Sequence, residues 1–210
     1  MGLFGRRKPD KGADIPKYLI PPELWDDPKI GEMLKMLGKK PDDPENLAIT
    51  PEHVERMIEE GRARILRNTR ELNEEIVRKG APNARVRPFW LIQDNCWTGD
   101  VGHFLIYVLR LNPYDDWNVV YLPENEDGSA ILDLPVHPGA SIPVFSEYGE
   151  KHIRTLQGRL MEALSAAEAN FRYGDYADAQ EETIASVKDL AEYFSGMLVE
   201  AHDKTKAARN

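Results

Sequence analysis

The chain has 210 residues, 41% of them hydrophobic and 9% aromatic, which is enough for one or two folded domains and argues against a disordered chain. Its formal net charge of −9 disfavours nucleic-acid binding, because that binding depends on lysines and arginines that displace counterions from phosphates. The single cysteine, Cys96, cannot form an internal disulfide, so we expect a reducing, cytoplasmic location. No apolar run approaches the ~20 residues of a transmembrane helix.

Residues 1–50 are predicted to form a proline-rich N-terminal arm. Proline fixes φ and removes a backbone donor, so this stretch cannot be one long helix. A short helix is expected over residues 29–37, ending at Gly38. The prolines of the arm are Pro9, Pro16, Pro21, Pro22, Pro28, Pro41 and Pro44.

A long amphipathic helix is predicted for residues 51–80. Thr50 and Pro51 are typical of a helix start, and Gly80-Ala81-Pro82 is typical of a helix end. The opposite, charged face is expected to be a solvated surface with i,i+4 ion pairs. Its apolar residues recur at spacings near 3.6: Val54, Met57, Ile58, Ile65, Leu72, Ile76 and Val77.

The middle of the chain changes character. Residues 89–92 and 117–122 are short apolar, aromatic and β-branched runs bounded by turn residues, which predicts strands. Residues 103–109 fit either a helix or a strand, because periodicity does not separate the two at this length. Residues 112–116 are typical of a turn.

The C-terminal part is predicted to be helical from Ser146 onward. One apolar stripe runs from Ile153 to Leu164 and another from Ile184 to Ala201, with a junction over residues 171–179. We expect an antiparallel helical hairpin.

Three pieces of sequence occur in an informative order. Phe-Trp-Leu-Ile-Gln begins at Phe89, and Asn118 is followed by an apolar run that ends in Leu-Pro. Leu-Pro-Val-His-Pro-Gly-Ala-Ser then ends at Ser141, before an aromatic that leads into a helix. This order resembles the AHH-type nucleases of the His-Asn-His (ββα-metal) superfamily, whose pattern runs His-His-Leu-Ile-Pro, then Asn with an apolar run ending in Leu-Pro, then Leu-Pro-x-His-x-Gly-x-His. The resemblance covers residues 88–164, a little over a third of the chain.

The resemblance implies a divalent metal ion held against a phosphate, with a histidine that removes a proton from the attacking water. Phe89 and Trp90 stand where the family has its paired histidines, and neither side chain can bind a metal or act as a base. His137 matches the first helical histidine, Ser141 stands at the second, and Asn118 matches the strand asparagine. If the protein is active, His137, Asn118 and His103 would be the catalytic residues, and His137 and Asp94 would hold the metal.

Each of these residues also has a structural interpretation. His137 is expected to cap or hydrogen-bond at the Pro138-Gly139 turn, and His103 to cap or pack at a helix. Cys96 has no cationic neighbour that would lower the pKa of its thiol, so a nucleophilic role is not expected.

We therefore expect an α+β fold, with a small ββα-like centre flanked by long helices and a C-terminal helical hairpin. The expected parts are the arm (1–50), the long helix (51–80), the AHH-like domain (81–165) and a C-terminal helical segment that packs on it (166–210). The leading hypothesis is a non-catalytic domain on a degenerate nuclease frame, with a protein partner and no cofactor. The alternatives are a divergent metal-dependent nuclease of the toxin or effector type, and a structural component that acts through its helices and arm, with oligomers possible.

Overall fold

The computed structural model describes residues 51–170 and 172–209. All of them belong to one compact unit, Ile49–Asn210. The predicted arm and its helix over residues 29–37 lie outside the described residues. The boundaries expected within the unit, after residues 80 and 165, stay predictions.

Helix α2, Pro51–Arg78, confirms the predicted long helix. It buries one side only, with Gly61 and Ile65 among the buried residues. Gly61 allows close approach of the loop before the second strand: a Cβ at this position would lie 2.7 Å from the Cβ of Tyr114. The Asn112 side chain donates to the Met57 carbonyl at 3.1 Å and so fixes this loop against α2.

The centre is a two-stranded antiparallel sheet of β1, Val86–Trp90, and β2, Val119–Pro123. The register pairs Val86 with Pro123 and Trp90 with Val119. Strand β1 begins three residues before the predicted run and ends two residues before its end. Strand β2 begins two residues after the start of its predicted run and ends one residue after its end. They nevertheless fall on the same apolar segments.

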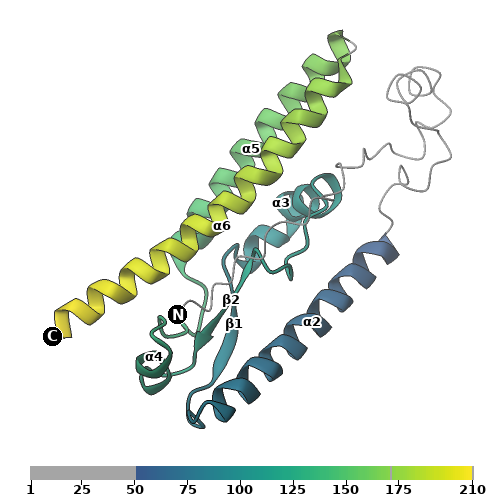
Figure 1. Ribbon diagram of the computed structural model, residues 1–210. Coiled ribbons are helices and arrows are strands. Elements are labelled where there is room, and N and C mark those ends of the chain that lie inside the picture. Colours follow the sequence, from purple (N-terminus) through teal and green to yellow (C-terminus); the bar gives the residue numbers. More distant parts are fainter. Residues whose placement is uncertain (1–50, 171, 210) are drawn as a thin grey trace. The chain divides into compact units, whose positions relative to one another are not determined.

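A helical connection joins the two strands (Figure 1). It consists of η3, Asp94–Trp97, then α3, Gly99–His103, then the π-helix η4, Phe104–Val108. Residues 103–108 are therefore helical, which decides between the two alternatives left by the sequence. A Cβ on Gly102 would lie 2.2 Å from the Trp97 carbonyl carbon, so only glycine allows α3 to turn back this closely on η3.

Two long antiparallel helices, α5 (Pro143–Asn170) and α6 (Tyr173–Arg209), follow the short α4 (Glu126–Leu132). Figure 1 shows α6 side by side with α5, with the C-terminal turns of α6 extending beyond it. The predicted hairpin is thus confirmed, but the predicted junction over residues 171–179 is wrong, because α6 already begins at Tyr173. Near its C-terminal end, Lys206 of α6 forms a 2.6 Å ion pair with Asp133, which ends α4 at a φ of 53°.

One apolar core joins the sheet, the helical connection and the hairpin. It includes Phe89 and Leu122 from the strands, Leu105 from η4, Phe145 from α5 and Phe194 from α6. The rings of Phe145 and Phe194 stack at 4.2 Å between centroids and so fasten the hairpin helices to each other. The predicted α+β class, with a two-stranded sheet among long helices, is confirmed. Among the described residues, no helix is long and apolar enough to cross a membrane.

Candidate functional site

The two residues at the expected histidine-pair position point to opposite faces of β1. The Phe89 ring meets the His137 ring edge-on at 5.5 Å and the Phe145 ring at 6.4 Å, and Phe89 is only 4% exposed. The Trp90 ring instead packs edge-on against Tyr114 at 6.1 Å. Consecutive strand residues alternate between faces, so only Phe89 shares a side with His137.

His137 lies in the loop between α4 and α5, not on a helix as the resemblance implied. The reason is local: Pro138 disfavours a helical conformation at the residue before it, and Gly139 follows with a φ of +80°. The expected turn interaction is present, because the Gly139 N–H donates to the His137 Nδ1 at 2.9 Å.

These contacts determine the tautomer of the His137 imidazole. The Nδ1 atom accepts from Gly139, so in the neutral ring the proton must be on Nε2. The Nε2 atom lies 3.2 Å from the Pro88 carbonyl oxygen and donates to it. The His137 backbone N–H also donates to the Pro123 carbonyl at 2.7 Å. Both ring nitrogens are therefore engaged by backbone groups of the protein itself.

Asn118 is fully buried and joins three segments. Its Oδ1 accepts from the Ile92 backbone N–H at 2.7 Å, and its Nδ2 donates to the Pro113 carbonyl at 2.9 Å. Its own carbonyl accepts from the Leu91 N–H at 2.9 Å, which extends the sheet pairing by one step. The side chain therefore fixes the chain just after β1 to the loop that leads into β2.

Side chains also form hydrogen bonds with the backbone groups of β1 that face away from β2, along the outer edge of the strand. The Leu91–Asn118 and Arg85–Glu124 backbone hydrogen bonds show which residues face β2, so Val86, Pro88 and Trp90 present their backbone groups to the other edge. The Asn73 amide bonds both the N–H and the carbonyl of Val86, at 2.9 and 3.2 Å. His137 bonds the Pro88 carbonyl, and the Gln93 side-chain amide bonds that of Trp90.

The other predicted site residues lie on the surface. His103 is exposed at the end of α3, and its ring stacks on Tyr107 at 4.7 Å. Asp94, in the first turn of η3, and Ser141, before α5, are also exposed. In the part of the chain that the structure describes, no three His, Cys, Asp or Glu residues come together as a potential metal site.

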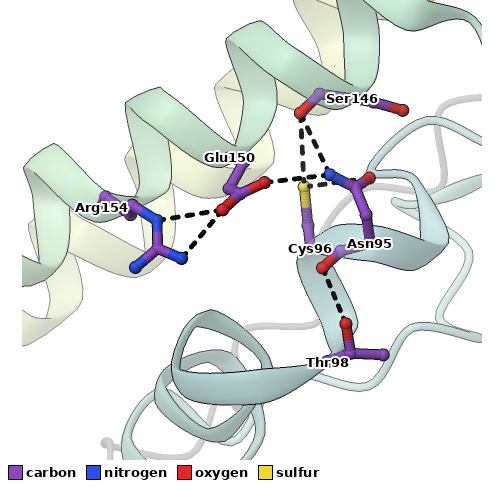
Figure 2. A network of polar contacts seen from close by, with 6 residues as sticks. All are labelled: Asn95, Cys96, Thr98, Ser146, Glu150 and Arg154. Atoms are coloured by element: carbon purple, nitrogen blue, oxygen red, sulfur yellow. Dashed lines mark hydrogen bonds and ion pairs between the residues drawn. The ribbon is translucent and has the colours of Figure 1, made fainter.

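Cys96 lies under the base of α5 beside a surface polar network (Figure 2). In this network the Asn95 amide donates to the Ser146 carbonyl at 3.4 Å and to Glu150 at 3.3 Å, and Glu150 forms an i,i+4 ion pair with Arg154 at 2.8 Å. Burial, followed by the charge of Glu150, raises the pKa of the Cys96 thiol to about 12. The thiol is therefore protonated near neutral pH, as expected for a structural cysteine.

An exposed aromatic pair was not anticipated from the sequence. Tyr148 on α5 and Tyr193 on α6 are 49% and 57% exposed, and their ring centroids are 6.3 Å apart. The sequence signal was available, because Tyr148 lies three residues after the core residue Phe145 and Tyr193 directly precedes the core residue Phe194. Only the pairing of α5 with α6 brings the two rings together.

Comparison with protein-family models, with curated proteins and with solved structures found no match. The resemblance to AHH nucleases therefore rests on the residue pattern in the sequence and stays a prediction.

Proposed function

We propose that the protein is a non-catalytic protein-binding or assembly domain built on a degenerate nuclease frame. The observation that carries this proposal is the engagement of His137: one ring nitrogen accepts from Gly139, the other donates to Pro88, and Phe89 covers the ring. A metal ligand or a general base needs a free nitrogen lone pair directed at the metal or the water. In this arrangement His137 offers neither.

The position facing His137 supports the same proposal. In an active nuclease of this frame, a second histidine would be needed on β1 to share the metal or to act as the base. Phe89 occupies the position on the correct face, and its ring belongs to the main apolar core. Replacing it with a polar group would cost packing energy, so Phe89 contributes to stability in place of chemistry.

The binding part of the proposal rests on the surface of the α5–α6 hairpin. An exposed apolar patch that is held by a rigid scaffold is typical of an interaction site. The Tyr148–Tyr193 pair fits this description, because Phe194, which is 1% exposed, lies within 6.3 Å of both rings and supports them from below.

A plasmid-cleavage assay tests the non-catalytic part. We expect no nicking of supercoiled plasmid by the purified chain with Mg²⁺, Ni²⁺ or Zn²⁺. His137→Ala removes the only matching family histidine, and His53→Ala, at an exposed position of α2, serves as the control. Metal-dependent nicking that His137→Ala abolishes and His53→Ala leaves intact would establish the divergent nuclease instead.

A second readout does not depend on activity. Long-range ¹H–¹⁵N spectra of the imidazoles should show His137 as the Nε2–H tautomer, and added Zn²⁺ should leave its signals unchanged. A Zn²⁺-dependent shift of the His137 nitrogens at low metal concentration would contradict the proposal, whatever the cleavage assay shows.

A further inference from the structure

The exposed face of the α5–α6 hairpin around Tyr148 and Tyr193 is apolar at its centre. Val144, one helical turn before Tyr148, is 51% exposed, and the His152 ring, one turn after it, stacks on Tyr148 at 5.9 Å. Tyrosine rings give a large contact area with little loss of side-chain entropy and are enriched in protein interfaces. The apolar part of this surface is therefore suited to receive an anchoring side chain.

An acidic stripe on α6 continues from this aromatic pair. Asp175, Asp178, Glu182 and Asp189 precede Tyr193 at spacings of three, four or seven residues, which places all five on one face of the helix. All five are exposed. Over about 18 residues, this stripe is about 27 Å long.

The part of α6 that carries the stripe is acidic. Residues 173–192 contain six Asp or Glu and one Lys, a net charge of −5. Among the described residues, no salt bridge involves the four carboxylates of the stripe, whereas Glu150 and Glu200 outside it are paired with Arg154 and Lys204. The hairpin therefore presents unneutralised negative charge directly beside an exposed aromatic pair.

We infer that this face binds a basic amphipathic helix of another protein, with an apolar residue on the Tyr148–Tyr193 pair and Lys or Arg residues along the acidic stripe. The inference rests on the proposed function and names the chemistry of the partner. Complementary charge steers such a partner and fixes its register, and an Arg near the pair gains a cation–π contact.

Charge also decides between this partner and other occupants. A nucleic acid would be repelled by the carboxylates, because its affinity comes from positive side chains. A second copy of the chain would bring two acidic α6 stripes together in the same region. Like charges at an interface are unfavourable, so a basic partner fits this face and a second copy does not.

The test is an NMR titration of the ¹⁵N-labelled full chain with a synthetic helical peptide of about 18 residues, which matches the length of the stripe. The peptide carries Leu anchors and Arg residues at three- and four-residue spacing, and a control peptide has the same composition in scrambled order. We expect shifts confined to the neighbourhood of Tyr148, Tyr193 and Asp189. The affinity should fall as salt is added, because exposed charges are screened.

Matched variants make the result specific. Tyr193→Ala should weaken binding of the ordered peptide about 10-fold or more, the size expected for an interface anchor. Double reversal of Glu182 and Asp189 to Lys should have an effect of similar size. Met161→Ala removes an apolar side chain of comparable exposure, 54%, from another side of α5 and should leave the affinity within about 2-fold.

Three outcomes would overturn the inference. The first is an absence of shifts at this face with millimolar peptide, or equal binding of the scrambled control. The second is a set of shifts elsewhere, for example around the exposed Leu66 of α2, which would leave the protein-binding function standing at another surface. The third is sedimentation evidence that the face pairs with a second copy. Nuclease activity would instead refute the proposed function, so the two failures are distinguishable.

Discussion

Replacement of Asn118 by alanine tests whether this residue acts as a structural joint. The substitution would leave the buried Ile92 N–H and the Pro113 carbonyl without their side-chain partners, which lie 2.7 and 2.9 Å away. Each such group left unpaired costs about 1 to 3 kcal/mol, so for the two groups we expect the free energy of unfolding to fall by about 2 to 6 kcal/mol. Domains of this size have about 5 to 15 kcal/mol in total, so the loss would be large.

Urea denaturation followed by circular dichroism measures this loss. With a slope of about 2 kcal/mol per molar urea, the midpoint should move down by about 2 M. Asn95→Ala is the matched control, because Asn95 is exposed and its hydrogen bonds are 3.3 and 3.4 Å long. It should change stability by less than about 0.5 kcal/mol. A loss below about 1 kcal/mol for Asn118→Ala would refute the structural role.

The remaining predictions concern a glycine pair and the cysteine. In a thermal melt, Gly102→Ala should destabilise the protein by about 3 kcal/mol or more, because its Cβ would meet the Trp97 backbone at 2.2 Å. Gly158→Ala, with open space around it in α5, should stabilise the protein by about 0.5 to 1 kcal/mol. Equal effects of the two substitutions would contradict the packing described. Cys96 should resist thiol reagents in the native protein at pH 8 and react at once in urea; rapid native labelling would contradict its burial. Because folding raises the pKa of this thiol from 9.0 to about 12, the unfolded state loses the proton first, and the Cys96 contribution to stability is lost as pH rises from 9 to 12. Between pH 9 and 12, the difference in the free energy of unfolding between wild type and Cys96→Ala should fall by about 1.4 kcal/mol per pH unit.

Most of the secondary structure was predictable because its signals are local. The apolar repeat of α2 and the glycine that follows the helix are patterns among residues close together in the sequence, and the structure places the helix at Pro51–Arg78. The predicted α5–α6 junction is wrong because the aromatic and glycine residues near Tyr173 are also typical of a turn. In the structure they form the first turn of α6, where the helix-forming residues that follow decide the conformation.

The candidate site was predictable in part. Proline and glycine after His137 predict a turn at that position, and the structure has this turn where the family pattern has a helix. The hydrogen bonds from Gly139 and to Pro88 could not be predicted, because Pro88 is 49 residues away and its carbonyl direction depends on the sheet register. The π-helix over Phe104–Val108 was unpredictable for a related reason, since tertiary packing determines its wider turn.

The side chains that cover the outer edge of β1 have a consequence for self-association. Among the described residues the sheet has two strands, so this edge would otherwise offer free backbone groups to a strand from another molecule, which is how many folded proteins begin to aggregate. Asn73 occupies the groups of Val86, and Pro88 has no N–H to donate, while its carbonyl is already held by His137. The histidine that resembles a catalytic residue therefore helps to keep the strand closed to neighbours, and its loss would open a route to intermolecular sheet growth.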